Sequence, residues 1–162
     1  MLLNEIFDTN NKVNWTSSDG VHEGSFLIDE EEYFIYAEEY SIQLDSGIKS
    51  ALDIGFRKGK SSALTGDQKP ARVIGSVLSG IKQKVHELNP DIIMFGALHK
   101  NDEVEKRKAL YRRIASLLSK TTKYNHLSKW YKFEGGEYAF IANFTPSEKD
   151  EELIEKLASY TK

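Results

Sequence analysis

The chain has 162 residues, enough for one domain, and its 40% hydrophobic and 29% charged residues are typical of a folded protein rather than a disordered one. It has no cysteine, which excludes disulfides, thiol nucleophiles and cysteine-ligated metal sites. The net charge of −3 hides three blocks: residues 1–50 hold 11 acids and 2 bases (−9), residues 51–132 hold 7 acids and 17 bases (+10), and residues 133–162 hold 7 acids and 3 bases (−4). The N-terminus shows no signal-peptide pattern and no apolar run is long enough to span a bilayer, so we expect a cytoplasmic protein without a membrane anchor.

The first third of the chain predicts β-structure. Residues 21–28 and 31–40 are rich in aromatic and β-branched side chains, and residues 51–57 alternate between apolar and polar positions. Asp19-Gly20 is a hairpin-turn signal that joins residues 21–28 to a short strand around residues 13–17. We therefore predict mainly antiparallel β-structure over residues 1–57.

A helical pattern follows a polar loop at residues 58–69. Apolar residues recur at helical spacing over residues 70–88 and again over residues 103–119. Between them, residues 91–98 form an apolar run of strand length. The pattern predicts a compact α-β-α unit over residues 70–119, in which the strands before and after the first helix pair in parallel.

The C-terminal part predicts a hairpin and a helix. Gly135-Gly136 divides residues 129–144 into two β-rich halves, and residues 147–162 are acidic with a few apolar anchors. We expect a single α+β domain over residues 1–146, in which the N-terminal antiparallel region and the α-β-α unit share one mixed sheet. The acidic terminal helix follows this domain.

The polar loop before the first helix is a candidate anion site. Thr65 and Gly66 lie in it, and Lys58 and Lys60 lie in the same stretch. The free amides and positive dipole end of the following helix suit a phosphate group. The glycines do not have P-loop spacing, so the alternative is a solvated loop with turn glycines.

The stretch Arg72-Val73-Ile74-Gly75-Ser76-Val77-Leu78 resembles the GNAT superfamily of acyltransferases. That family has Gln or Arg, two residues, Gly, one residue and then Gly or Ala at the start of a helix; here Val77 stands at the last position. The order of elements from residue 51 to 144 is similar as well. The resemblance implies a GNAT-like mixed sheet and, if the protein is an enzyme, acetyl-CoA as its cofactor. It assigns cofactor binding to Thr65 and Gly66 in the loop and to Arg72, Val73, Ile74, Gly75 and Ser76 at the helix start.

Tyr111 and His99 are the candidate catalytic residues. Tyr111 lies in Ala109-Leu110-Tyr111-Arg112-Arg113-Ile114, which resembles the later GNAT segment whose tyrosine protonates the departing CoA thiolate. The alternative for Tyr111 is a core role, because it lies on the apolar side of its helix. His99 follows the strand at residues 91–98, and ligands often bind at the C-terminal ends of strands in α/β sheets.

The chain also resembles small proteins of tailed bacteriophages. In those proteins a Thr-Gly loop precedes the first helix, as Thr65-Gly66 does here, and an Arg/Lys-x-x-Leu-Tyr segment lies on the second. Lys108-Ala109-Leu110-Tyr111 stands at that place, with one residue fewer between the base and Leu-Tyr. The resemblance implies a viral origin and a location in the cytoplasm of an infected bacterium.

A basic segment with interleaved aromatic residues is a candidate surface for nucleic acid or a protein partner. Phosphates pair with Lys and Arg, and unstacked bases stack on aromatic rings. The alternative is a solvated or internally paired face. The candidate residues are Lys58, Lys60, Lys106, Arg107, Arg112, Arg113 and Trp130.

The divided charge favours a phage-type accessory protein that binds a host or viral protein or nucleic acid through segregated charged surfaces. An active acyl-CoA-dependent N-acyltransferase is the alternative, and a virion structural component is a second. The four histidines lack helical ligand spacing, so we expect no metal site. The sequence leaves open the oligomeric state, and whether the charged blocks neutralise one another or lie on the surface.

Overall fold

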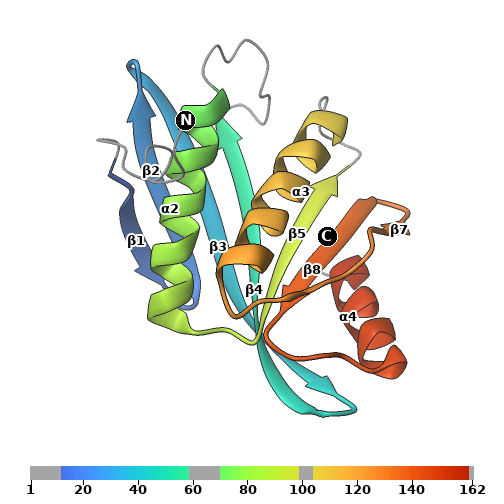
Figure 1. Ribbon diagram of the computed structural model, residues 1–162. Helices are drawn as coiled ribbons and strands as arrows, with labels where there is room; N and C mark the ends of the chain where they lie inside the picture. The colour runs from blue at the N-terminus through green and yellow to red at the C-terminus, as the bar shows by residue number, and fades with distance from the viewer. Residues whose placement is uncertain (1–11, 59–69, 99–103, 161–162) are drawn as a thin grey trace.

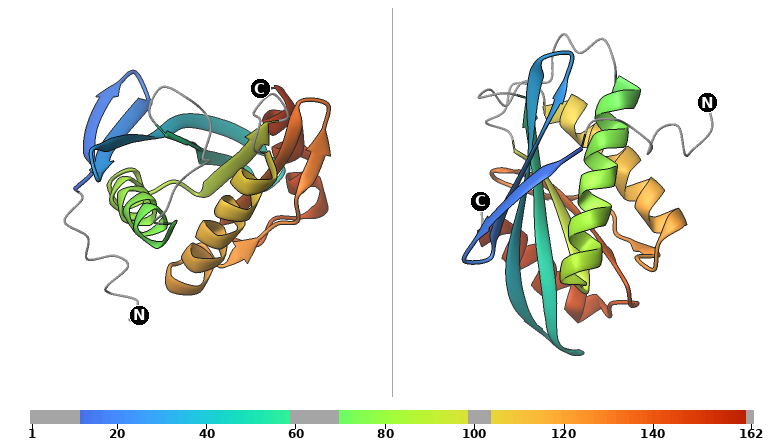
Figure 2. Two further views of the ribbon diagram at one scale, coloured as in Figure 1. Left: turned by 90° about the horizontal axis from the view of Figure 1, so that it is seen from above. Right: turned by 90° about the vertical axis from the view of Figure 1, so that its left-hand side faces the viewer.

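The computed structural model describes residues 12–58, 70–98 and 104–160 (Figure 1). A mixed sheet runs through the molecule, with α2 and α3 on one face and α4 on the other (Figure 2). The class is α+β, as predicted. In chain order the elements are β1 (Asn14–Ser18), β2 (Val21–Ile28), β3 (Glu31–Leu44), β4 (Gly47–Lys58), α2 (Pro70–Leu88), β5 (Ile92–Leu98), α3 (Val104–Thr121), β6 (His126–Leu127), β7 (Tyr131–Phe133), β8 (Gly136–Ala142) and α4 (Glu148–Tyr160).

The strand order is β1-β2-β3-β4-β5-β8-β6, with β7 paired to β8. β4 and β5 pair in parallel, and every other described pair of strands is antiparallel. The predicted parallel pair is confirmed, because α2 returns the chain over the sheet and β5 starts again at the same end as β4. The sheet is therefore antiparallel on both sides of one central parallel pair.

Two tight hairpins build the N-terminal side of the sheet. The β1–β2 turn is Asp19-Gly20, with φ of 49° and 79°, as the Asp-Gly signal predicted. The β2–β3 turn is Asp29-Glu30, with φ of 51° and 71°. Both turns twist in the sense that suits a hairpin, but Glu30 adopts a left-handed conformation without the freedom of glycine.

The hairpin of β3 and β4 is longer than predicted. Their pairing runs from Tyr33–Lys58 to Leu44–Gly47, whereas the sequence pattern indicated strands at residues 31–40 and 51–57. Ile42 and Leu44 are buried in this extension beneath the second face of the sheet. The alternation of Ile42 and Leu44 with polar residues is the signal of this extension.

α4 closes the second face of the sheet and begins with a capping box. The Asp150 amide donates to Ser147 Oγ (3.1 Å) and the Ser147 amide to Asp150 Oδ2 (3.3 Å), while Asp150 Oδ1 accepts from the amide of Ser46 (3.2 Å). Burial alone would raise the pKa of the Asp150 carboxyl, but these hydrogen bonds lower it below its usual value. Ile154 and Ala158 then bury the helix against the sheet.

Candidate functional site

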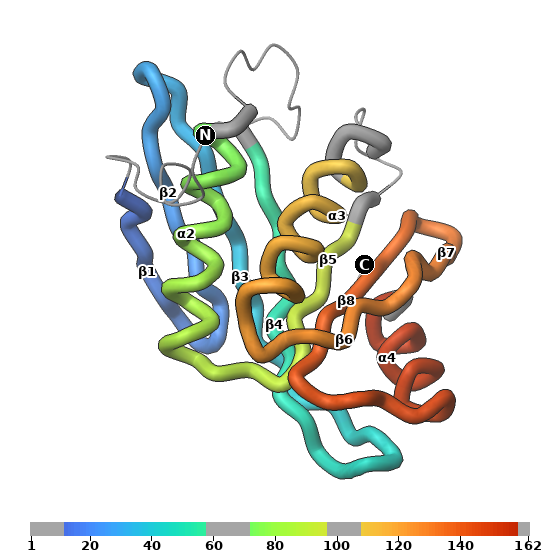
Figure 3. Tube along the Cα trace, viewed as in Figure 1, coloured from blue at the N-terminus to red at the C-terminus, as the bar shows by residue number. Residues whose placement is uncertain are grey.

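The two central strands separate at the middle of the sheet. The parallel pairing of β4 with β5 covers four residue pairs, from Ala51–Ile92 to Ile54–Phe95. Beyond that point β4 stays paired to β3 as far as Lys58, and β5 stays paired to β8 as far as Leu98. Figures 1 and 3 show the two strands diverging toward the end of the sheet where α2 and α3 begin. Within the described residues, β4 and β5 therefore do not pair with each other beyond Ile54–Phe95.

Such an opening has a chemical consequence. Backbone amides and carbonyls are strong hydrogen-bonding groups that need partners when they are taken out of water. An unpaired strand edge is a template for another extended chain. A ligand that pairs at such an edge must be extended and carry its own hydrogen-bonding groups.

The segment Arg72–Ser76 forms the first turns of α2. Val73 and Ile74 are buried in the core between the sheet and the two helices, and Arg72 is exposed with Nη1 3.3 Å from Asp29 Oδ1. The amides of Gly75 and Ser76 are donors within the helix, because the residues four positions earlier are also helical. The amides free to meet an anion are those of the first turn, ahead of Val73. The assignment of Val73, Ile74, Gly75 and Ser76 to cofactor binding stays a prediction.

Ser76 has a feature that the sequence did not indicate. Its side chain is completely buried, and its Oγ has no hydrogen-bond partner among the described residues. A buried hydroxyl without a partner carries a desolvation cost.

Tyr111 lies at the point where the strands part. It is 1% exposed on α3, and its ring centroid is 5.8 Å from that of Phe95, the last residue of β5 that pairs with β4. Ile114 and Ala115 are buried in the same core. Tyr111 is therefore a core residue by burial and lies beside the opening by position, and its role as a proton donor stays a prediction.

The other face of the opening carries a carboxylate that sequence reasoning did not select. Asp53 is 5% exposed on β4, opposite Met94 of β5 and one pair before the ladder ends. Burial, the hydrogen bond to Glu38 and the charge of Asp53 raise the pKa of the neighbouring Tyr40. The sequence placed Asp53 on the polar side of an alternating strand, and charged side chains are rarely buried without a reason, so its burial had no local signal.

The structure brings together part of the predicted basic surface. Lys108 Nζ and Arg112 Cζ each lie 5.8 Å from the Trp130 ring centroid, and Lys108 also pairs with Glu137 at 2.8 Å. Lys108 and Glu137 are both largely buried, so this cation is internally paired. Arg112 and Arg113 are exposed. The guanidinium of Arg112 therefore lies at the surface beside the half-buried ring of Trp130.

The remaining predicted site residues are not placed. Thr65, Gly66, Lys60 and His99 lie outside the described residues, as do the side chains of Lys58, Lys106 and Arg107.

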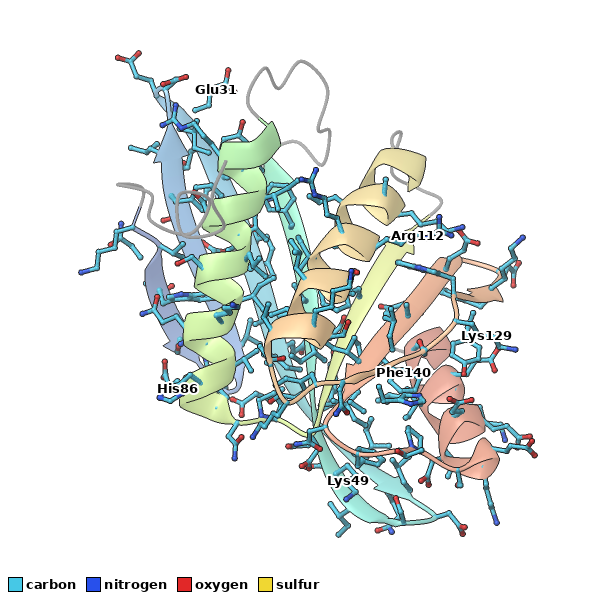
Figure 4. All side chains as sticks on the ribbon, viewed as in Figure 1. Glu31, Lys49, His86, Arg112, Lys129 and Phe140 are labelled. Atoms are coloured by element: carbon cyan, nitrogen blue, oxygen red, sulfur yellow. The ribbon has the colours of Figure 1, made fainter. Side chains whose placement is uncertain are left out.

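The charged blocks remain on the surface. The acidic residues Asp29–Glu32 at the β2–β3 turn are exposed, as are Arg113, Lys129 and Lys132 of the basic block. Figure 4 shows Glu31 at the outer end of its hairpin and Arg112 and Lys129 on the opposite side of the molecule. Ion pairs join the blocks at Arg72–Asp29 and Lys108–Glu137. The segregation is therefore presented to solvent at these positions.

Among the described residues, no group of three His, Asp or Glu side chains could hold a metal ion, and no helix is both long and apolar enough to cross a membrane. Comparisons of the chain with protein-family models, with curated proteins and with solved structures found no match.

Proposed function

We propose that the protein binds an acyl-CoA in the opening between β4 and β5 and transfers the acyl group to an amine, as the resemblance to GNAT acyltransferases implies. The observation that carries the proposal is the end of the parallel ladder at Ile54–Phe95, while both strands keep their outer partners. Peptides add to exposed strand edges through main-chain hydrogen bonds. The pantetheine arm of CoA is extended and has two amides, so it can pair in the same way.

The start of α2 supports a phosphate group beside this opening. The first turn of α2 has no acidic residue, and its free amides and positive dipole end attract anions. The exposed Arg72 adds a cation, and its Nη1 lies 3.3 Å from Asp29 Oδ1. A pyrophosphate at the helix start would compete with Asp29 for Arg72.

Two side chains have suitable chemistry for the transfer itself. An acyl-CoA supplies an acyl group activated as a thioester. Tyr111 is the candidate to protonate the sulfur released when the C–S bond breaks, and the carboxylate of Asp53 is the candidate to accept the proton that the attacking amine gives up. Direct attack by the amine needs no covalent intermediate on the protein.

Calorimetric titration with acetyl-CoA tests the proposal. We expect saturable binding at micromolar to millimolar ligand, roughly the range in which enzymes bind substrates. Absence of binding at millimolar acetyl-CoA would contradict the proposal.

Removal of the Tyr111 hydroxyl separates chemistry from binding. Tyr111→Phe keeps the ring against Phe95 and is expected to lower kcat by about 10²-fold or more with little change in acetyl-CoA affinity. Tyr124→Phe is the matched control, because it removes another buried phenol hydroxyl far from the opening, the one that donates to Pro90 O. Equal turnover in Tyr111→Phe and wild type would remove Tyr111 from the mechanism.

A second candidate is a phage-type accessory protein that binds single-stranded nucleic acid through the surface around Trp130. The observation that favours it is the exposed guanidinium of Arg112, whose Cζ lies 5.8 Å from the centroid of this ring. Fluorescence anisotropy with a labelled oligonucleotide should then show binding that weakens with salt and falls in Arg112→Gln but not in Lys149→Gln, on the distant α4. Binding that is equal in both variants would count against it.

A further inference from the structure

Three side chains on the outer strands of the sheet form a chain of hydrogen bonds that the proposed acyl transfer does not use. His22 Nδ1 lies 2.6 Å from Ser17 Oγ, and His22 Nε2 lies 2.8 Å from Glu39 Oε2. Ser17 is on β1, His22 on β2 and Glu39 on β3. A hydroxyl, an imidazole and a carboxylate in this order are the parts of a serine nucleophile site.

The β1–β2 turn sets Ser17 opposite His22. The two-residue turn Asp19-Gly20 is closed by the pair Ser18–Val21. Pairs alternate along an antiparallel hairpin, so the next pair, Ser17–His22, is a non-hydrogen-bonded pair, in which side chains on one face come closest. The backbone amide of Ser17 therefore points away from β2, toward the outer edge of β1, which is the last strand of the described sheet (Figures 1 and 2).

Glu39 reaches the other nitrogen of the same imidazole from β3. His22 pairs with Ala37, so Glu39 lies diagonally across from it, two residues further along β3 on the same face. The Glu39 amide donates to the carbonyl of Gly20 at 2.9 Å, which fixes this part of β3 beside the β1–β2 turn. The strand register therefore holds the three groups in line.

The two hydrogen bonds assign one tautomer to the neutral imidazole of His22. A carboxylate can only accept, so Nε2 carries the hydrogen and donates it to Glu39. The lone pair is then on Nδ1, which accepts the hydrogen bond of the Ser17 hydroxyl. His22 is therefore placed to take the Ser17 proton, and the Glu39 carboxylate stabilises the imidazolium that results.

The hydroxyl is open to solvent, whereas the imidazole is shielded. His22 is 6% exposed, Ser17 is exposed, and the Glu39 side chain is 46% exposed. Trp15 is half-buried two residues before Ser17 on the same face of β1, and its ring lies over Gly24, where an added Cβ would be 3.0 Å away. A substrate can therefore reach Ser17 Oγ from solvent and meet apolar surface beside it.

We propose that Ser17, His22 and Glu39 form a serine nucleophile site that hydrolyses carboxylic esters. Ser17 and His22 are its catalytic residues, and Glu39 acts through His22 as a positioning residue. The proposal does not depend on acyl-CoA binding, because this site lies on β1, β2 and β3, whereas the opening lies between β4 and β5.

The reaction has two steps that share one proton carrier. Ser17 Oγ attacks the ester carbonyl and its proton moves to His22 Nδ1, while the Ser17 amide donates to the oxygen that becomes negative. The C–O bond to the alcohol breaks, the alcohol leaves with the proton from His22, and the acyl group stays on Ser17 Oγ. Water then gives a proton to His22 and attacks the acyl group, which leaves as the acid while Ser17 regains its proton.

A fluorescent fluorophosphonate tests the proposal, because it labels serines that are activated as nucleophiles. Ser17 Oγ displaces fluoride and forms a stable ester to phosphorus. We expect mass spectrometry of peptides to locate the label on Ser17 in wild type and in Ser18→Ala, and to find none in Ser17→Ala. Ser18 is the matched control, because it is the next residue of β1, is also exposed and has its side chain on the other face of the strand.

The base and the carboxylate have tests of their own. His22→Gln should slow the labelling of Ser17 by about 10²-fold or more. Glu39→Gln keeps an acceptor for the Nε2 hydrogen but loses the charge, so it should lower kcat for para-nitrophenyl acetate by about tenfold or more with KM unchanged. Circular dichroism checks that His22→Gln is folded, and Glu39→Gln, at a largely exposed side chain, keeps the test decisive if it is not.

Three outcomes would overturn the proposal. They are no label on Ser17 at millimolar probe, equal labelling of Ser17 and Ser18 in wild type, and equal kcat for the ester in wild type and Glu39→Gln.

Discussion

Substitution of Gly96 by alanine tests the packing at the opening. Gly96 is the first residue of β5 beyond the parallel ladder, and it pairs with Tyr138 of β8. A Cβ atom on Gly96 would lie 2.6 Å from Cζ, 2.8 Å from Cε1 and 2.9 Å from the hydroxyl oxygen of Tyr138. The tyrosine ring therefore occupies the space that any side chain at residue 96 needs.

The expected cost follows from how firmly that ring is held. Tyr138 is 2% exposed, and its ring packs on that of Phe133 at 5.4 Å. An ordinary contact begins near 3.4 Å, so the ring or the strand must move by about 0.8 Å. Overpacking of this kind costs about 1–3 kcal/mol, and the loss of glycine freedom in the unfolded chain returns about 0.4–1 kcal/mol. We expect Gly96→Ala to lower the free energy of unfolding by about 1–2 kcal/mol.

Urea unfolding followed by circular dichroism measures this change. The control is Gly55→Ala, on the strand edge facing the opening opposite β5, where the nearest atom to a new Cβ is Tyr36 Cβ at an ordinary 3.8 Å. We expect Gly55→Ala to be neutral or to stabilise by up to about 1 kcal/mol. The substitution Gly96→Ala should also cost less in a Tyr138→Leu background, because the smaller side chain leaves room. If Gly96→Ala is neutral, or costs the same in both backgrounds, the packing argument is wrong.

The remaining predictions concern a turn, a cap and a buried phenol. Glu30→Gly should stabilise the protein by about 0.5–1 kcal/mol in urea unfolding, because glycine adopts the φ of 71° without strain. Asp150→Asn should lower the free energy of unfolding by about 1–2 kcal/mol at pH 7, because it weakens the hydrogen bonds to Ser46 and to the α4 cap. Since folding lowers the pKa of Asp150, the difference between variant and wild type should shrink as the pH falls below about 4. Burial raises the pKa of Tyr124 to about 12, so wild type should lose stability as the pH rises from about 10 to 12. Tyr124→Phe no longer donates to Pro90, so this variant should be less stable than wild type at pH 7. It should also lose less stability than wild type between about pH 10 and 12.

Local sequence signals predicted most of the fold. The helical spacing predicted α2 at residues 70–88, the bounds that the structure has, and Asp19-Gly20 located the β1–β2 turn. The β7–β8 hairpin is confirmed, but its turn is Glu134-Gly135, one residue before the predicted Gly135-Gly136, because Gly136 already pairs with Phe133. The β3–β4 hairpin was predicted too short, because its extension is buried only where α4 packs on it. The alternation of Ile42 and Leu44 with polar residues was nevertheless present in the sequence.

Less of the candidate site than of the fold could be predicted from the sequence. The segments around Arg72 and Tyr111 were selected from a motif resemblance, and the opening between β4 and β5 was not predictable from local pattern. The end of a ladder depends on the paths of two strands separated by a whole helix, whereas periodicity describes one strand at a time. The burial of Asp53 has the same cause, because Met94 and the second face of the sheet surround it only in the folded chain.

The central claim is that the divergence of β4 from β5 forms the binding site for an acyl-CoA. Titration of isotopically labelled protein with acetyl-CoA, followed through the amide signals, tests it most directly. We expect saturable shifts at Gly55–Arg57 of β4 and at Gly96 of β5, with Val85 and Asn89 near the C-terminal end of α2 unchanged. Saturation with no shift on these two strand edges, or no binding at millimolar acetyl-CoA, would contradict the account.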